Sequence, residues 1–165
     1  EVVKWQPCSR SRAGIPATTE EVGMKTVKQL IQAKGGAVHA IAPEQKVFEA
    51  LRLMAEKDVG ALVVMTGNAL VGILSERDYA RKVILLGKSS HDLAVRDIMT
   101  ERVVTIHPAQ TVDDCMALMT ARRIRHLPVV ENDRLLGILS IGDLVKAVIA
   151  EQGETIRQLE SYIHS

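Results

Sequence analysis

Two short segments of the chain place an aspartate three residues after a serine, a spacing that suits recognition of a nucleoside phosphate. Ser75 and Asp78 follow the tripeptide Gly-Ile-Leu, and Ser140 and Asp143 follow the same tripeptide further along the chain. If each serine begins a helix, the free amides of the first turn attract a phosphate, and the serine hydroxyl donates to a phosphate oxygen. The aspartate can accept two hydrogen bonds from a ribose diol. These four residues are therefore candidate ligand contacts.

The same spacing also has a purely structural interpretation. Ser-x-x-Asp can form a capping box, in which the serine side chain accepts a bond from the amide three residues later and the aspartate reaches back to the serine amide. Capping boxes are common, so one copy alone would favour this structural role. The presence of two copies favours the ligand-binding interpretation.

Basic side chains are distributed unevenly around the two segments. Arg125-His126 leads into a predicted strand of the second half, where the first half has Gly60-Ala61. Arg77 lies within the first segment, where the second has Gly142. An arginine guanidinium suits phosphate, and a histidine can donate to it, although a lone histidine beside an apolar strand is more often structural. We expect two unequal clefts, and the better supported one combines Arg125, His126, Ser140 and Asp143.

Both segments belong to a longer internal repeat with a constant offset of 65 positions. This offset aligns Pro43 with Pro108 and Leu70 with Leu135, without a gap. A constant offset over this length indicates a duplicated supersecondary unit, and two copies are too few for a solenoid. We predict two halves that close on each other around a pseudo-twofold axis, with clefts between them.

Hydrophobic periodicity and turn residues predict a mixed α/β (α+β) fold, with the order strand, helix, strand, strand, helix in each half. In the first half these elements cover residues 38–41, 47–57, 61–65, 69–74 and 76–86. In the second half they cover residues 103–106, 112–123, 126–130, 135–139 and 141–150. A helix at 26–33 precedes the first half. A helical tail at 152–163 follows the second half, and Gly153 is expected to bend it away from the preceding helix.

The predicted organisation begins with residues 1–23, which show no periodicity. We interpret them as a disordered tail or as residues added by the expression vector, with a targeting peptide as the alternative. The remaining parts are an N-terminal helix (24–37), the first repeat (38–87), a linker (88–102), the second repeat (103–150) and a C-terminal helical tail (151–165).

Composition argues against several classes of partner. The net charge is +1 and there is no run that mixes aromatic and basic residues, so we expect no nucleic-acid partner. No run of 18 apolar residues occurs, so we expect no membrane association. Cys8 and Cys115 form no spacing motif, and Cys115 lies on an apolar helical stripe. Two cysteines without a pairing motif favour a reducing compartment, and we expect a cytoplasmic location.

The two halves resemble a tandem pair of CBS domains, also called a Bateman module, over about residues 38–150. The resemblance is carried by the strand that ends in proline, the apolar helix, the runs 60–64 and 125–130, and the two Gly-Ile-Leu-Ser-x-x-Asp segments. Residues 75–82 and 122–128 are also similar to stand-alone bacterial CBS-pair signal-transduction proteins and their plant organellar relatives. Those are regulatory proteins without an attached enzyme.

The resemblance implies an adenine-nucleotide ligand, AMP most often, with ATP, ADP, NAD or S-adenosylmethionine in some members. It also implies that serine contacts phosphate, aspartate contacts ribose, and adenine lies against the first strand of a repeat. Two modules are expected to form a disk-shaped homodimer. The first repeat lacks the basic pair before its strand, so its cleft is expected to be the weaker one. The candidate binding residues are Ala40, Ile41, Ser75, Arg77, Asp78, Thr105, Ile106, Arg125, His126, Pro128, Ser140 and Asp143.

Together these observations favour a regulatory module that senses energy or redox state and acts on a separate partner protein in trans. One alternative is a ligand-free dimerisation scaffold. The other is a phosphoryl-transfer or hydrolytic enzyme, which would need metal ligands or a nucleophile and base beside the phosphate. The sequence contains no Walker loop and no Cys/His ligand cluster. We therefore expect no catalysis, no catalytic cofactor and no metal site.

Overall fold

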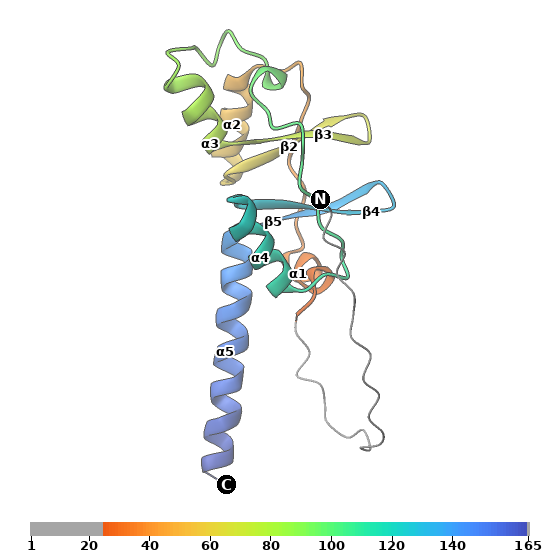
Figure 1. Cartoon of the computed structure of the whole chain (residues 1–165), viewed down its shortest axis with the longest axis vertical. Coiled ribbons are helices and arrows are strands. Elements are labelled where there is room, and N and C mark those ends of the chain that lie inside the picture. Colours follow the sequence, from red (N-terminus) through yellow and green to blue (C-terminus); the bar gives the residue numbers. More distant parts are fainter. Residues whose placement is uncertain (1–24, 165) are drawn as a thin grey trace, which may run out of the picture.

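The computed structural model describes residues 25–164 and shows two α/β units stacked along the long axis of the molecule (Figure 1). The predicted tail at 1–23 lies outside the described residues. The first unit contains β1 (Ala40–Ile41), α2 (Val47–Lys57), β2 (Ala61–Thr66), β3 (Ala69–Ser75), α3 (Glu76–Tyr79) and the π-helical turn η1 (Ala80–Ile84). The second contains α4 (Val112–Arg122), β4 (His126–Glu131), β5 (Arg134–Ser140) and α5 (Ile141–Ile163). The predicted α/β fold with two tandem repeats is confirmed.

The two β-hairpins have the same register, which shows the duplication at the level of single residues. Ala61 pairs with Ser75 in the first hairpin, and His126 pairs with Ser140 in the second. Each hairpin also carries a register shift at the equivalent point, between Val64 and Met65 in one and between Val129 and Val130 in the other. The strands therefore deliver each Ser-x-x-Asp segment to the same place in its unit.

The first strand of each repeat is shorter than predicted. In the first repeat only Ala40–Ile41 forms a strand, parallel to β2. The predicted strand at 103–106 is wrong, because only Ile106 makes a bridge, with Val129. Its amide donates to Pro128 O and its carbonyl accepts from the Val130 amide, at 3.0 and 2.9 Å. Residues 103–105 form no strand or bridge.

The segments that precede the two repeats are exchanged between them. Helix α1 (Val27–Lys34) comes before the first unit, but Val27 is fully buried in the core of the second. The 3₁₀ turn η2 (Val95–Asp97) comes before the second unit, but Val95 is fully buried in the core of the first. Backbone bonds from Val27 to Gln110 O (2.9 Å) and from Val95 to Gln45 O (2.8 Å) fix the exchange. Burial of each valine contributes about 1.5–3 kcal/mol, so each core needs its neighbour's segment.

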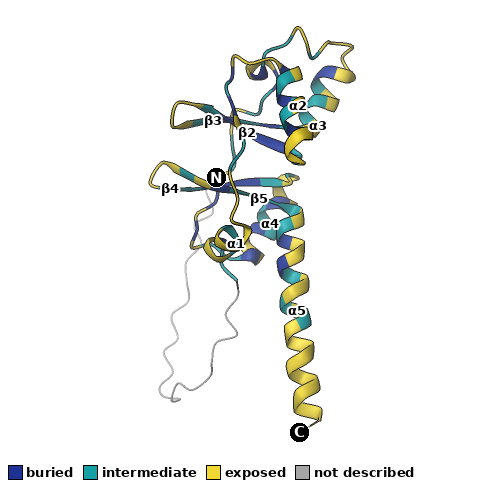
Figure 2. Ribbon diagram, turned by 180° about the vertical axis from the view of Figure 1, so that it is seen from behind, coloured by how far each residue is buried: buried dark blue, intermediate teal, exposed yellow. Residues whose placement is uncertain are grey.

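The helices after the two hairpins differ in length. The predicted helix at 76–86 ends early, as four α-helical residues followed by η1. In the second repeat α5 runs without interruption from Ile141 to Ile163. The predicted bend at Gly153 is wrong, because one interior glycine costs a long helix only about 1 kcal/mol. The far half of α5 extends beyond the second unit and is mostly exposed (Figure 2).

None of the helices within residues 25–164 combines the length and apolar character needed to cross a lipid bilayer.

Candidate functional site

Both predicted serines begin helices. Ser75 Oγ accepts a hydrogen bond from the Asp78 amide at 3.2 Å, and Asp78 Oδ2 accepts one from the Ser75 amide at 3.0 Å. Ser140 and Asp143 form the same pair of bonds, at 3.2 and 2.8 Å. The capping-box interpretation is therefore confirmed in both repeats. The four side chains are only partly buried, so the caps hold them beside the surface where a ligand can reach them.

A cavity of about 590 Å³ lies between the two units, and it joins residues of both repeats. The first repeat contributes the capping box and the basic start of the following helix. The linker contributes a stretch that begins at Thr100, and the second repeat contributes the turn between α4 and β4. The lining residues are Gly60, Ile73, Ser75, Glu76, Arg77, Asp78, Arg81, Lys82, Thr100, Arg102, Val103, Val104, Arg122, Arg123, Ile124, Arg125 and His126.

This cavity groups the candidate residues differently from the sequence prediction. Arg125 and His126 share it with Ser75 and Asp78 of the other repeat, whereas Ser140 and Asp143 do not line it. Stacking the two units sets the start of β4 against the start of β2. A Cβ added at Gly60 would lie 3.6 Å from Nε2 of His126. The basic residues of one repeat thus face the serine and aspartate of the other.

Asp78 is held firmly at one wall of the cavity. Beyond its bonds to Ser75, its Oδ1 lies 3.1 Å from Lys82 Nζ and accepts a bond of 3.4 Å from Thr100 Oγ1. Lys82 Nζ also donates to Ile98 O at 2.8 Å, which ties the helix after β3 to the linker. The carboxylate of Asp78 is therefore oriented by groups on three segments, and its side chain is 16% exposed.

The opposite wall is linked to the first repeat through Arg77 and carries His126. Arg77 Nη1 donates to the carbonyl oxygen of Arg123 at 3.3 Å, and Arg123 ends α4 in the left-handed conformation. Burial lowers the pKa of His126, and repulsion by Lys34 and Arg125 adds to this, while Asp143 opposes it. Its imidazole is therefore neutral near neutral pH, with one nitrogen able to donate and the other able to accept.

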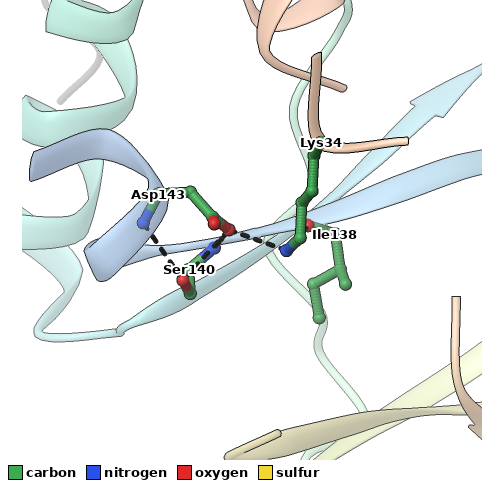
Figure 3. Close-up of polar contacts among 4 residues, drawn as sticks. All are labelled: Lys34, Ile138, Ser140 and Asp143. Carbon is green, nitrogen blue, oxygen red and sulfur yellow. Dashed lines mark hydrogen bonds and ion pairs between the residues drawn. The ribbon is translucent and has the colours of Figure 1, made fainter. Parts of the chain in front are cut away.

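The second Ser-x-x-Asp segment is closed by α1. Lys34 Nζ lies 2.7 Å from Asp143 Oδ2 and donates to Ile138 O at 3.0 Å (Figure 3). A hollow of only about 10 Å³ lies between the end of α1 and β5, lined by Lys34 and Ile138 among others. A Cβ added at Gly137 would lie 2.5 Å from Ile31 Cδ1, so α1 packs directly on β5. Ser140 and Asp143 therefore form a second location, apart from the large cavity, whose carboxylate is already paired with Lys34.

The remaining candidates lie apart from the large cavity. Ile41 and Ile106 are buried in the cores of the first and second repeats, and Pro128 is buried within β4. Ala40 and Thr105 are exposed, but neither lines the cavity. In the second repeat the lining residues come just before the predicted pair, at Val103 and Val104.

Sequence reasoning also missed several basic residues of the cavity. Arg81, Lys82, Arg102, Arg122 and Arg123 line it but were not among the candidates. Their charges are visible in the sequence, in two adjacent pairs and one single arginine. The signal was missed because these residues come from three segments that only the packing of the two units brings together.

Comparisons with known proteins agree with this architecture. The family model described as CBS domain matches residues 35–84 and 95–150. The chain is 40% identical to the mitochondrial CBS domain-containing protein CBSX3 of Arabidopsis thaliana, over 94% of this chain and 81% of that protein. A solved CBS-domain protein from Burkholderia ambifaria MC40-6 is 49% identical, with a TM-score of 0.75 over 78% of this chain and 96% of that one.

A more distant structure shares the fold. It is a CBS domain pair in complex with 5′-methylthioadenosine and S-adenosyl-L-methionine, and it is 23% identical to this chain. The TM-score is 0.70 over 78% of this chain and 99% of that one. Together with the duplicated register and the two matched segments, these findings show that the chain belongs to the CBS domain family, as a tandem pair of CBS domains.

Proposed function

We propose that this CBS pair is a regulatory module that binds an adenine nucleotide in the cavity between its repeats. The observation that carries the proposal is the union, in one cavity of about 590 Å³, of a serine and aspartate from one repeat with an arginine and histidine from the other. CBS pairs as a class are regulatory modules that bind adenine nucleotides. The volume lies within the range of small-molecule sites.

Each part of the nucleotide has a matching group in the cavity. Asp78 is the acceptor for the ribose diol, and the diol takes the place of the bonds from Lys82 and Thr100 to Oδ1. Arg125 and the neutral His126 donate to phosphate, and Ser75 does so once its hydroxyl turns from Asp78 Oδ2, to which it donates at 2.9 Å. Ile73, Val103 and Val104 supply the apolar wall for adenine, in place of the Thr105-Ile106 pair expected from the resemblance.

The resemblance to CBS pairs ranks AMP first among the ligands, with ADP, ATP, NAD and S-adenosylmethionine as alternatives. One relative of the same fold was solved with 5′-methylthioadenosine and S-adenosyl-L-methionine, both of which contain adenosine. The adenosine part is thus the feature that these ligands share. The cavity also contains groups for a phosphate, which favours a nucleotide over a nucleoside.

Regulation requires that the ligand bind two arrangements of the protein unequally. The hydrogen bond from Arg77 to the Arg123 carbonyl connects the two repeats at the cavity wall. A phosphate that binds Arg77 breaks this bond and so changes how the two units are held together. We propose that this change reports the energy or redox state of the cell to a partner protein in trans. A homodimer is the expected assembly, and the cytoplasm is the location favoured by the sequence, although the plant relative CBSX3 is named as mitochondrial.

A catalytic role is less well supported by the geometry. The acidic residues that line the cavity are Glu76 and Asp78, and Asp78 already accepts bonds at both oxygens from Ser75, Lys82 and Thr100. A carboxylate held in this way suits recognition of a diol better than abstraction of a proton. A ligand-free dimerisation scaffold remains the second candidate function, favoured by the pairing of Asp143 with Lys34.

Thermal unfolding with and without ligand tests the proposal. AMP, ADP, ATP, NAD and S-adenosylmethionine are each titrated against the full chain after mass spectrometry has checked for a co-purified ligand. A ligand at 100 times its dissociation constant is expected to stabilise the protein by about 2.7 kcal/mol. A shift that saturates with an adenine compound and weakens in Asp78→Asn supports the proposal. The absence of both a shift and a co-purified ligand would favour the scaffold.

A further inference from the structure

The cavity between the repeats contains a concentration of positive charge that the chain as a whole does not have. Six arginines and one lysine line it, against two carboxylates, whereas the whole chain carries a net charge of only +1. The arginines come from three places: the helical segment after β3, the linker, and the turn between α4 and β4. A single phosphate-binding point needs fewer groups than this.

Most of this charge is not neutralised within the protein. Lys82 pairs with Asp78 at 3.1 Å. Among the residues that the structure describes, none of the six arginines forms an ion pair with a carboxylate. A guanidinium stays charged at every relevant pH, so the arginines repel each other across the cavity until an anion enters. The anion that relieves this repulsion best is one with several negative charges spread along its length.

These observations separate the ligands that the proposed function leaves open. AMP presents one phosphate, which two arginine forks can satisfy, and the guanidiniums on the remaining segment then stay unpaired. A chain of two or three phosphates extends from one wall toward the other and meets arginines of all three segments. S-adenosylmethionine carries a positive sulfonium, which the same field repels.

We propose that the cavity is selective for a nucleoside carrying two or more phosphates, with Arg102 of the linker as a contact for the phosphates beyond the first. This inference rests on the proposed function and reverses the ligand order that the family resemblance implies. It gives the linker a direct part in recognition. The added phosphates of a nucleoside diphosphate or triphosphate thus bridge Arg102 to basic residues of both repeats, whereas a monophosphate does not contact Arg102.

Calorimetric titration of the full chain with AMP, ADP and ATP, in EDTA so that Mg²⁺ does not mask the phosphates, tests the proposal. ATP is expected to bind about tenfold or more tightly than AMP, because each added charge-assisted hydrogen bond strengthens binding by roughly that factor. The affinity for ATP should also fall more steeply with added KCl than the affinity for AMP. Arg102→Gln is expected to weaken ATP about tenfold and to leave AMP nearly unchanged.

Arg157→Gln is the matched control, because Arg157 is an exposed arginine of α5 outside the cavity. It should leave the affinities for all three nucleotides unchanged. Equal affinities for AMP and ATP, or an equal loss of both in Arg102→Gln, would overturn the selectivity and leave the adenine-nucleotide function intact. Failure of all three nucleotides to bind, together with no thermal shift in NAD or S-adenosylmethionine, would instead overturn the proposed function. Thermal unfolding of each variant confirms that the fold is retained.

Discussion

Lys34 Nζ lies 2.7 Å from Oδ2 of Asp143. A lysine of the helix before the first repeat therefore pairs with the carboxylate of the second repeat that the sequence predicts to bind ribose. The same ammonium group donates to the carbonyl of Ile138. The repeats therefore differ in a way that their sequences alone do not reveal. One aspartate faces a large cavity, and the other is covered by α1.

Removal of this lysine should change how many nucleotides the chain binds. The wild-type protein is expected to bind one nucleotide per chain, and Lys34→Ala is expected to bind up to two, because the location at Ser140 and Asp143 is then uncovered. Titration calorimetry gives the stoichiometry. Lys28→Ala, an exposed lysine on the same helix, serves as the control and should stay at one. Two sites in the wild type would show that Lys34 does not block binding.

Asp78 should matter more for nucleotide binding than Asp143. Asp78→Asn removes a charged acceptor at the cavity wall, and affinity is expected to fall about 10- to 100-fold, since hydrogen bonds to charged groups contribute about 1.5–3 kcal/mol. Asp143→Asn makes the same chemical change at the covered location and should alter affinity little. Fluorescence titration with a labelled nucleotide can compare the two variants. A larger loss in Asp143→Asn would restore the grouping that the sequence predicted.

The bond between Lys34 and Asp143 should make stability depend on pH in the acidic range. Burial by itself raises the pKa of Asp143, but hydrogen bonds from Lys34 and Ser140 outweigh it, and the pKa lies below its usual value. A carboxylate whose pKa is lowered by folding stabilises the protein above its unfolded pKa of about 4, and loses that contribution as the pH falls through its folded pKa. Because both side chains are partly exposed, solvent screens the pair, and it contributes no more than about 1 kcal/mol.

Urea unfolding at a series of pH values from about 6 to about 2.5 measures this dependence. Wild type should lose more stability over this range than Asp143→Asn, whose side chain does not titrate. Because other carboxylates titrate in the same range, the difference between the two proteins is the quantity to compare. Parallel curves for the two proteins would contradict the assignment.

The proposed homodimer should depend on two exposed isoleucines at equivalent positions of the two repeats. Ile84 and Ile149 are separated by the repeat offset of 65 and are 56% and 63% exposed. Contiguous exposed apolar side chains mark interaction surfaces, and Ile84 is followed by exposed Leu85 and Leu86, while Ile149 lies one helical turn from exposed Val145. Changing both to glutamate is expected to give a monomer in sedimentation velocity, whereas Leu136→Glu, at an exposed leucine of β5, should not. A monomeric wild type, or a dimer that survives both changes, would rule out this face.

The local features of the site could be predicted from the sequence, whereas the set of residues that share the cavity could not. The caps at Ser75 and Ser140 depend on residues three apart, and the hairpins depend on alternating residues and turns, so short-range patterns were sufficient. The facing of Asp78 and His126 depends on how the two units stack, and no spacing within one repeat encodes it. The closure by Lys34 likewise depends on the exchange of α1 to the second unit.

The failed predictions about secondary structure also have physical causes. Ile106 keeps the two backbone bonds of a strand, but residues 103–105 make no strand pairing, and Val103 and Val104 line the cavity instead. Gly153 does not bend α5, because the cost of one glycine is small beside the cooperativity of a helix of 23 residues.

The continuity of α5 can be tested by changing Gly153 to alanine and comparing the effect with the same change at Gly87. A Cβ added at Gly153 or at Gly87 would meet nothing within 4 Å, so neither change creates a clash. Gly153 lies inside the helix, and alanine there is expected to stabilise the protein by up to about 1 kcal/mol. Gly87 has φ of 65°, in the left-handed region, and alanine there is expected to destabilise it by about 1 kcal/mol. Chemical denaturation of both variants gives the two signs. If Gly153→Ala were also destabilising, α5 would have to bend near that residue, as the sequence predicts.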